Sequence, residues 1–223
     1  MAAIGESTRD ADLELLPAAR RLEEMWNAPV HSTYASTEIA TAFCECPERR
    51  GGHLRPELAT LEILDDAGGP VPSGGVGEAV VTPLGVQGMP LVRFRTGDIS
   101  FLIDDPCPCG RRTPRLGPIL GRKNQMLKYK GTTLFPSSIL AALEGRDEVT
   151  GAYVEARRGE GGTDRVIVKV NVSKAEITTD DIADMLRAHI RVAPEVVLVS
   201  EAELQERTAQ PSKRKRATFF DFR

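Results

Sequence analysis

The sequence lacks a long apolar run, a secretory signal and an excess of basic charge, and each absence excludes a class of protein. No stretch approaches the roughly 18 apolar residues of a membrane-spanning helix. Acidic side chains occupy the start, where a signal would be apolar. Aromatic residues make up 5% of the chain, and the formal net charge is −3. We therefore expect a cytoplasmic protein that binds neither membranes nor nucleic acid.

The chain is long enough for two modest domains, and its hydrophobic fraction excludes wholesale disorder. It has 223 residues, of which 41% are hydrophobic, whereas domains run roughly 100–200 residues. Residues 11–27 predict an amphipathic helix that Pro29 ends, and its apolar face carries Leu15, Ala19, Leu22 and Trp26. Residues 55–105 predict a small sheet or barrel of short strands, at 58–64, 78–82, 91–94 and 99–103.

A second domain is predicted from Gly121 onward. Its patterns predict a strand at 125–130, a helix at 137–144, paired strands at 149–157 and 165–172, a helix capped by Thr179, and a strand at 196–199. This order predicts a compact α+β domain of about 100 residues. The tail, from Gln210, is polar and basic and then turns aromatic.

The four cysteines form two Cys-x-Cys pairs, Cys44/Cys46 and Cys107/Cys109, and His53 follows the first pair. Thiolates and an imidazole are the donors that Zn²⁺ prefers in a tetrahedral structural site. Five candidates thus compete for four places. A disulfide between the clusters, or simply buried thiols, are the alternatives.

Two short blocks have residue types that bind nucleotides. At 34–38 (YASTE), the Tyr34 ring can lie on adenine, Thr37 can donate to phosphate and Glu38 can hold Mg²⁺. A loop with a helix cap is the alternative. At 93–98 (RFRTGD), the carboxylate of Asp98 can accept both hydroxyls of a ribose, and the alternative is a surface turn in which Arg95 pairs with Asp98.

Two basic blocks have similar alternatives. At 121–125 (GRKNQ), Arg122 can contact phosphate or ribose, and glycine at 121 and 131 allows a hinge; a linker with solvated charges is the alternative. The basic run at 213–216 (KRKR) has three interpretations. It is a solvated tail, a signal for nuclear import or for nucleic-acid binding, or a segment that contains an active-site lysine.

In this order and at these separations, the blocks are similar to those of one family. The sequence resembles the carboxyl-terminal half of the phenylacetate–coenzyme A ligase family, within the adenylate-forming superfamily of acyl-CoA synthetases. The resemblance covers nearly the whole chain and is carried by YASTE, MPLVRFRTGD, CPCGRRTPRLGPILGR and MLKYKGTTLFPSSI. It implies an adenylate-forming fold of α/β and α+β class. Residues 1–120 would complete the large AMP-binding domain, with a cysteine-rich β-barrel or sheet subdomain, and residues 121–223 would form a small mobile domain.

The resemblance implies ligation of a carboxylic acid, such as an aryl acid like phenylacetate, to coenzyme A. The acid would attack the α-phosphate of ATP to give an acyl-adenylate and pyrophosphate, and the coenzyme A thiolate would then release AMP. Tyr34 would contact adenine, Thr37 the α-phosphate, Glu38 the Mg²⁺ ion, Asp98 the ribose hydroxyls, and Arg122 the ribose or phosphate.

The resemblance also assigns the remaining roles. Lys215 falls at the family's adenylation lysine, and the loop at Gly131 would serve the coenzyme A step after the small domain swings. The residues that match the family's structural zinc site are Cys46, His53, Cys107 and Cys109, which leaves Cys44 as the extra thiol. Members of the family often pair, so a homodimer is one state that the resemblance allows.

The sequence departs from the family at Ala35, Ser36 and Asn124, and the glycine that usually precedes the lysine is missing, so the lysine could instead lie two positions from Lys215. The sequence also contains no glycine-rich phosphate loop. We therefore expect a fragment that needs the missing N-terminal half as its partner and forms no adenylate by itself. The alternative is a non-catalytic, zinc-stapled module that binds nucleotide or protein.

Overall fold

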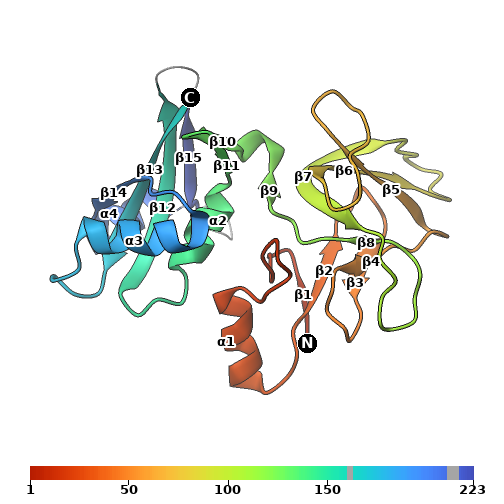
Figure 1. The fold of residues 1–223 in the computed structure, drawn as a ribbon, viewed down its shortest axis with the longest axis horizontal. Helices are drawn as coiled ribbons and strands as arrows, with labels where there is room; N and C mark the ends of the chain where they lie inside the picture. Colours follow the sequence, from red (N-terminus) through yellow and green to blue (C-terminus); the bar gives the residue numbers. More distant parts are fainter. Residues whose placement is uncertain (160–162, 210–215) are drawn as a thin grey trace. The chain divides into compact units, whose positions relative to one another are not determined.

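The computed structural model describes residues 1–159, 163–209 and 216–223. It divides into two compact units, Met1–Asn124 and Gln125–Arg223, whose elements are labelled in Figure 1. Each unit has its own hydrophobic core. Within the described ranges, the helices are all too short or too polar to cross a membrane.

One mixed sheet organises the first unit. Its main path runs β1-β2-β3-β4-β8-β7-β6-β5, and β9 pairs with β7. β1 and β2 are parallel and are connected through helix α1, whereas the other pairs are antiparallel. The elements are β1 (Ala2–Ile4), α1 (Pro17–Trp26), β2 (His31–Ala35), β3 (Ala42–Glu45), β4 (Gly52–His53), β5 (Ala59–Leu64), β6 (Val76–Pro83), β7 (Phe94–Ile103), β8 (Arg115–Leu116) and β9 (Gly121–Arg122).

The core of the first unit lies where β3, β5, β6 and β8 contribute side chains that are almost inaccessible to solvent. Its fully buried members are Ile39, Phe43, Ala59, Ile63, Ala79, Val81 and Leu116. β6 is buried along nearly its whole length because β5 and β7 cover both of its edges. This rigid centre holds the ends of β2 and β7, which carry two of the nucleotide-type blocks.

β7 is a single strand of ten residues with a bulge in its middle. In the pairing with β6, Glu78 lies opposite Ile99 and Val80 lies opposite Arg95. Three residues of β7 therefore lie between these pairs, whereas β6 has only Ala79 there. Gly97 has a φ of +73°, which allows the extra residues to fold out of the ladder. A bulge of this kind turns a strand side chain in a new direction, here that of Asp98.

Two predictions for the first unit are wrong in detail. The expected small sheet or barrel is a sheet, because the described strands follow an open path. The strands predicted at 91–94 and 99–103 are one strand, because the glycine between them makes a bulge instead of a break. The first helix begins at Pro17 rather than near residue 11, and Ala19 is its only buried residue.

The second unit is an α+β sandwich around a four-stranded sheet of order β14-β13-β12-β15. Helices α2 and α3 pack with the buried core that includes Val154 and Ile182, while α4 packs with Tyr153 through Leu204. Neighbouring residues of β12 therefore face opposite layers, as the pleat of a strand requires. The elements are β10 (Leu127–Tyr129), β11 (Thr132–Leu134), α2 (Pro136–Leu143), β12 (Val149–Arg158), β13 (Asp164–Val172), α3 (Thr179–Ile190), β14 (Glu195–Leu198), α4 (Glu201–Thr208) and β15 (Phe219–Phe222), and the short helix η1 (Lys123–Gln125) spans the boundary between the units.

The structure corrects the predicted ends of this unit. Thr178, and not Thr179, caps α3: its hydroxyl accepts from the backbone N–H of Asp181, whose carboxylate accepts from the N–H of Thr178. The sequence did not predict α4 or β15. Phe220 of β15 lies edge-on to Tyr153 with ring centroids 5.4 Å apart, and the guanidinium of Arg207 lies 4.5 Å from the Phe220 ring. These contacts hold the aromatic tail in the sheet.

Candidate nucleotide and metal sites

Asp98 is the centre of the first candidate site. It is buried, with 5% of its surface exposed. Tyr34, at the end of β2, donates its hydroxyl to Asp98 Oδ2 at 2.7 Å, and Arg122 of β9 places Nε 2.8 Å from Asp98 Oδ1. β9 pairs with β7 in a register that sets Arg122 directly opposite Asp98. Three of the sequence blocks therefore meet at one carboxylate.

The alternative pairing of Arg95 with Asp98 does not occur in the structure. Arg95 binds Glu78 instead, at 2.6 Å. The bulge separates the two residues, since Arg95 remains in register with β6 whereas Asp98 turns toward β9. The turn is thus not a simple surface ion pair, and Asp98 is left with Tyr34 and Arg122.

Burial and the hydrogen bond to Asp98 raise the pKa of Tyr34 well above its ordinary value. The phenol therefore remains protonated and acts as a donor at all physiological pH values. Its ring is half-buried and lies 6.1 Å from the Phe43 ring, centroid to centroid. The hydroxyl is thus held in place while part of the ring is open to solvent.

Thr37 and Glu38 lie in the turn that follows β2, and both are exposed. The backbone N–H of Glu38 itself, and then the Ser36 hydroxyl, hold the pKa of the Glu38 carboxyl below its ordinary value. The positive charge of Arg122 acts in the same direction. Glu38 is therefore an ionised carboxylate within electrostatic reach of Arg122.

The sequence analysis missed a buried carboxylate beside this site. Glu78 is 4% exposed and accepts from Arg95 Nε at 2.8 Å, from Lys123 Nζ at 3.2 Å and from the backbone N–H of Gly97 at 3.2 Å. Lys123 also contacts Asp66 Oδ1 at 2.8 Å. Glu78 thereby ties the β7 bulge to the segment that follows β9. Its only signal in the sequence is an acid within an otherwise apolar strand.

Burial alone would raise the pKa of Glu78, but Arg95 and Lys123 together lower it. Glu78→Gln is therefore expected to lower the free energy of unfolding by about 1–3 kcal/mol near pH 7. Because the folded-state pKa lies below the unfolded one, this stabilisation is present above pH ~4.3 and is lost as the pH falls through the folded value. Urea unfolding at a series of pH values measures the difference between the variant and the parent protein.

Glu62→Gln is the matched control for Glu78→Gln, because Glu62 of β5 also pairs with an arginine, Arg93, but is far more exposed. It should cost less than about 1 kcal/mol. Equal losses in the two variants, or a Glu78→Gln difference that persists unchanged below pH 4, would contradict the role given to Glu78.

Gly131 lies at the tip of the hairpin that joins β10 to β11. Lys130 and Gly131 both have positive φ, +46° and +77°, and they connect Tyr129 to Thr132 as a two-residue loop. Two positive φ values in succession are typical of a type I′ turn, in which glycine is favoured. An added Cβ at Gly131 would meet nothing within 4 Å, so the glycine serves the backbone conformation rather than packing.

Lys215 lies outside the described residues. The described chain on either side of it comes close together, since the N–H of Ala217 donates to the carbonyl of Thr208 at 3.0 Å. The side chain of Arg223, at the end of β15, then contacts Asp164 at 3.0 Å.

The second candidate site consists of Cys46, His53, Cys107 and Cys109. Their ligand atoms all lie within 4.8 Å of one another. Cys46 Sγ and Cys107 Sγ are 3.6 Å apart, and so are Cys109 Sγ and His53 Nε2. A tetrahedron of Zn–S bonds of about 2.3 Å has edges of about 3.7 Å. The donor set and its spacing thus fit a zinc ion with three thiolates and one imidazole.

Strand pairing explains how these four residues meet. His53 pairs with Cys44 on β3 and with Arg115 on β8, so β4 lies between the loops that carry the two cysteine pairs. The loop of the second pair turns where the N–H of Gly110 donates to the carbonyl of Cys107, and Gly110 has a φ of +89°. Cys44 points outward and is exposed, which leaves it apart from the cluster.

The surroundings of the cluster suit metal binding better than a disulfide. All four cysteines are free. Burial lowers the pKa of His53, so the ring is neutral, which is the ligating form. His53 Nδ1 lies 3.2 Å from Thr113 Oγ1, a partner of the kind that orients metal-bound imidazoles. The sequence analysis missed Thr113, because it lies 60 residues from His53 in the chain and meets the imidazole ring only in the folded structure.

Sequence and structure comparisons place this fold among known proteins. Residues 131–223 match the family described as AMP-binding enzyme C-terminal domain. Phenylacetate-coenzyme A ligase of Thermus thermophilus is 38% identical over 149 residues, which cover 63% of this chain and 34% of the ligase. The Pseudomonas putida ligase of the same name is 27% identical over 197 residues, 80% of this chain and 43% of that enzyme. The chain thus spans less than half the length of these relatives.

Among solved structures, 2-hydroxyisobutyryl-CoA ligase in the postadenylation state, in complex with R3-HIB-AMP, has a TM-score of 0.76 and 24% identity, over 100% of this chain and 48% of that one. The fold is therefore that of an adenylate-forming enzyme. Within that class the sequence is similar to the phenylacetate–coenzyme A ligases, which are acid–thiol ligases, and the predicted resemblance to their carboxyl-terminal half is confirmed.

Proposed function

We propose that this chain supplies the carboxyl-terminal, AMP-binding part of an ATP-dependent ligase that joins an aryl or other carboxylic acid to coenzyme A. In the first step the substrate carboxylate attacks the α-phosphate of ATP, and pyrophosphate leaves. In the second the thiolate of coenzyme A attacks the acyl carbonyl, and AMP leaves. Relatives named phenylacetate-coenzyme A ligase and a neighbour bound to an acyl-AMP support this assignment.

The observation that carries the proposal is the buried carboxylate of Asp98. A carboxylate offers about four acceptor positions, of which Tyr34 and Arg122 use two. Two positions therefore remain for the two hydroxyls of a ribose. Hydrogen bonds to a partly desolvated carboxylate are stronger than those in water. Arg122 is then positioned beside the ribose and phosphate, and the open part of the Tyr34 ring can lie against adenine.

The turn after β2 supplies the groups for the phosphate end. Thr37 can donate its hydroxyl to the α-phosphate, and the ionised carboxylate of Glu38 can hold Mg²⁺. An Mg²⁺ ion held by Glu38 would supply positive charge to neutralise the phosphates. Both residues are exposed, as a surface that receives a ligand requires.

The cluster of Cys46, His53, Cys107 and Cys109 would hold Zn²⁺ in a structural role. Four protein donors leave no open position for water or substrate. The ion would cross-link the loop after β3 to the loop between β7 and β8, which would stabilise the part of the unit next to β3 and β8.

The two parts of the chain have different roles in the proposed cycle. The unit Met1–Asn124 belongs to the large nucleotide-binding domain and holds AMP, whereas the unit Gln125–Arg223 forms a domain that moves between the half-reactions. Lys215 serves adenylation, by neutralising charge that develops on the phosphate and carboxylate oxygens. The turn at Gly131 serves the attack of coenzyme A.

Separate assays of the half-reactions test this division. The chain would be joined to the portion of the Thermus thermophilus ligase that it does not match, so that both steps can be measured. Lys215→Ala is expected to slow pyrophosphate release from ATP and phenylacetate about 100-fold, and to leave thioester formation from pre-made phenylacetyl-adenylate nearly unchanged. Gly131→Ala should do the reverse, because alanine is strained at a φ of +77°.

Gly145→Ala is the control for the glycine substitution, since Gly145 also has a positive φ of +76° but follows α2. It should affect both steps equally or neither. Equal losses of both steps in Lys215→Ala would reject the assigned role of the lysine.

A non-catalytic module that binds nucleotide or protein is the second candidate. Such a module would bind AMP through Asp98, yet it would show neither half-reaction in the joined protein.

A further inference from the structure

Two consecutive basic residues, Arg122 and Lys123, contact two different buried carboxylates. Arg122 of β9 pairs with Asp98 at 2.8 Å, and the ammonium of Lys123 lies 3.2 Å from Glu78 Oε2. Both carboxylates are almost inaccessible to solvent. Burial of a charge is costly unless it has a partner, so each of these contacts also satisfies a carboxylate. The segment is therefore fixed at two successive side chains.

The backbone of this segment has only a short strand to hold it. β9 is two residues long and pairs with β7 in the described chain. Two residue pairs offer few backbone hydrogen bonds, so the ion pairs of Arg122 and Lys123 supply a large part of the attachment. The first unit ends at Asn124, one residue further on.

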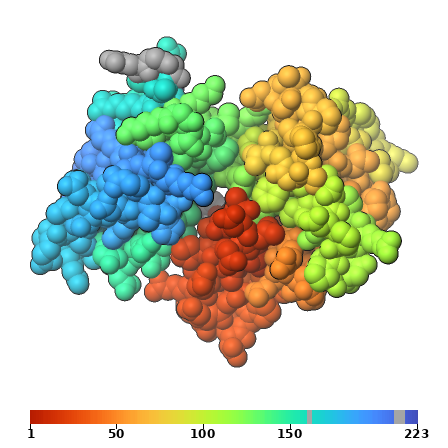
Figure 2. All heavy atoms as spheres, in the orientation of Figure 1, coloured from red at the N-terminus to blue at the C-terminus, as the bar shows by residue number. Residues whose placement is uncertain are grey.

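Lys123 contacts a second carboxylate as well. Its ammonium lies 2.8 Å from Oδ1 of Asp66, in the connection between β5 and β6. Figure 2 shows this connection at the surface, and the side chain of Asp66 is 79% exposed. Glu78 is thus the buried inner partner of the lysine, and Asp66 is the solvated outer one. We call Lys123, Glu78 and Asp66 the lysine clamp.

Glu78 also holds the backbone that presents Asp98. Its Oε1 accepts from the N–H of Gly97 at 3.2 Å, within the β7 bulge and immediately before Asp98. Thr96 supports the same bulge, because its hydroxyl donates to the carbonyl of Ala79 at 2.8 Å and accepts from the N–H of Asp98 at 3.1 Å. One buried carboxylate therefore contacts both the bulge that orients Asp98 and the segment that follows β9.

We propose that Glu78 and Lys123 are positioning residues that couple nucleotide binding at Asp98 to the anchoring of residues 121–124. With the clamp closed, Glu78 keeps the β7 bulge and this segment in one arrangement. The clamp can open without leaving Glu78 unpaired, because Arg95 remains on the same carboxylate. A nucleotide on Asp98 stabilises the bulge and, through Glu78, the closed clamp. The nature of the ligand rests on the proposed function, whereas the clamp is defined by contacts within the first unit.

Hydrogen–deuterium exchange and calorimetry measure the coupling, with AMP as the probe and the chain as purified. Saturating AMP should slow exchange of the amides of residues 121–124 about 5-fold or more in the parent chain. Lys123→Met should abolish this protection, speed exchange of the same amides without AMP, and weaken AMP binding about 5-fold. The two factors should agree, because coupling between sites is reciprocal. Lys123→Arg keeps the charge and should restore most of the protection.

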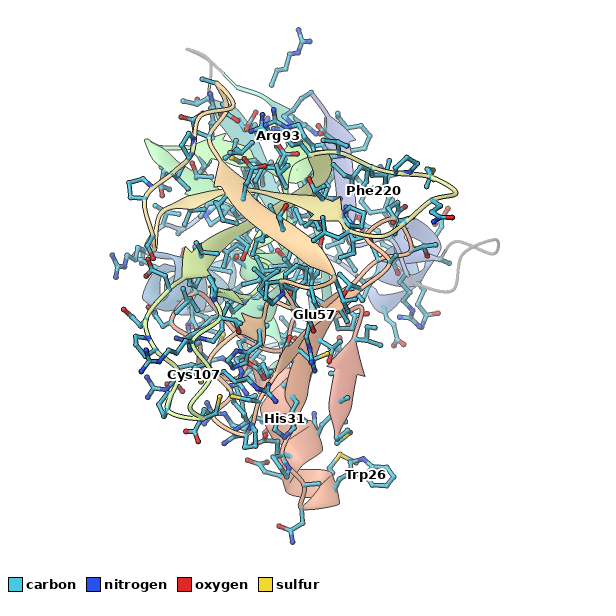
Figure 3. The ribbon with its side chains drawn as sticks, turned by 90° about the vertical axis from the view of Figure 1, so that its right-hand side faces the viewer. Trp26, His31, Glu57, Arg93, Cys107 and Phe220 are labelled. Carbon is cyan, nitrogen blue, oxygen red and sulfur yellow. The ribbon has the colours of Figure 1, made fainter. Side chains whose placement is uncertain are left out.

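Arg93→Met is the matched control for Lys123→Met. Arg93, labelled in Figure 3, immediately precedes β7 and pairs with Glu62 at 3.0 Å. The variant therefore removes the same charge and one ion pair without touching the clamp, and it should change neither the protection nor the affinity for AMP. Asp66→Asn removes the outer partner alone and should reduce the protection less than Lys123→Met does. Circular dichroism checks that each variant keeps its fold.

Equal protection by AMP in Lys123→Met and Arg93→Met would overturn the proposal, and so would equal affinities for AMP in these two variants. AMP binding that depends on Asp98 but leaves exchange of residues 121–124 unchanged would reject the coupling and keep the proposed function. A parent chain that binds no AMP would reject the proposed function and the coupling together. Faster exchange in nucleotide-free Lys123→Met would then keep only the clamp as an anchor of the segment.

Discussion

Cys46→Ala is expected to abolish binding of one zinc ion per chain and to lower the free energy of unfolding by about 4 kcal/mol or more. The reason is that ligands from loops 61 residues apart meet in this cluster, at a Cys46–Cys107 sulfur distance of 3.6 Å. A site that exists in the folded state alone turns metal affinity into folding stability. Metal analysis by mass spectrometry and urea unfolding, with and without a chelator, measure the two effects.

Cys44→Ala is the control, because Cys44 is a cysteine two residues earlier whose side chain is exposed. It should keep the zinc and the stability of the parent chain. Equal losses in Cys44→Ala and Cys46→Ala would contradict the assignment of ligands. So would a parent chain that contains no zinc and has four thiols that react rapidly.

The metal cluster shows which part of a site a sequence can predict. Cysteine and histidine have few uses at close spacing, so residue type and separation suffice to predict the four ligands, which lie within 4.8 Å of one another; the ion remains a prediction. Thr113, which faces the imidazole, is a common residue with no such signal. Glu23 likewise has no signal in the sequence, although its ion pair with Arg49 connects α1 to the loop after Cys46.

Strand β7 illustrates a different difficulty. Glycine usually interrupts a strand pattern, so the sequence predicted two strands around Gly97. The structure keeps one strand because the ladder to β6 resumes after the bulge. Whether a glycine ends a strand or bends it depends on the neighbouring strand, which local sequence does not describe.

Helix α1 and strand β15 show the limit of periodicity. The apolar face of the first helix was predicted correctly as a pattern, yet Leu22 and Trp26 are exposed, because a pattern says nothing about what covers a face. β15 was missed because its phenylalanines follow a basic run that is typical of solvated tails. Pairing with β12 gives this short segment its structure.

Buried charge was the least predictable feature. Arg9 pairs with Glu45 at 2.7 Å, with side chains only 5% and 1% exposed, and Glu78 is similarly enclosed. Charged residues are nearly always exposed, so the sequence provides no reason to expect Arg9, Glu45 and Glu78 to be buried. Both connect segments far apart in the chain, and both are found from the folded structure alone.

Asp98→Ala is expected to weaken binding of AMP about 1,000-fold, measured by calorimetry on the chain as purified. The substitution removes the acceptor of both ribose hydroxyls and leaves Arg122 without its 2.8 Å partner. Each hydrogen bond from a ribose hydroxyl to a charged carboxylate contributes about 1.5–3 kcal/mol, so the loss of two accounts for a factor of this size. Asp104→Asn, at the end of the same strand, is the control, because this carboxylate contacts Ser73 and no nucleotide-type block.

Asp98→Asn separates the geometry of the site from its ligand. The neutral amide no longer opposes ionisation of the phenol, so the pKa of Tyr34 should fall toward its ordinary value of about 10, although burial keeps it above that value. Ultraviolet titration detects the shift, and Tyr34→Phe identifies which of the three tyrosines it belongs to. If the phenol titrates lower while AMP affinity equals that of Asp104→Asn, the contact between Tyr34 and Asp98 stands and the ribose role is rejected. If both change together, the same carboxylate organises the site and binds the nucleotide.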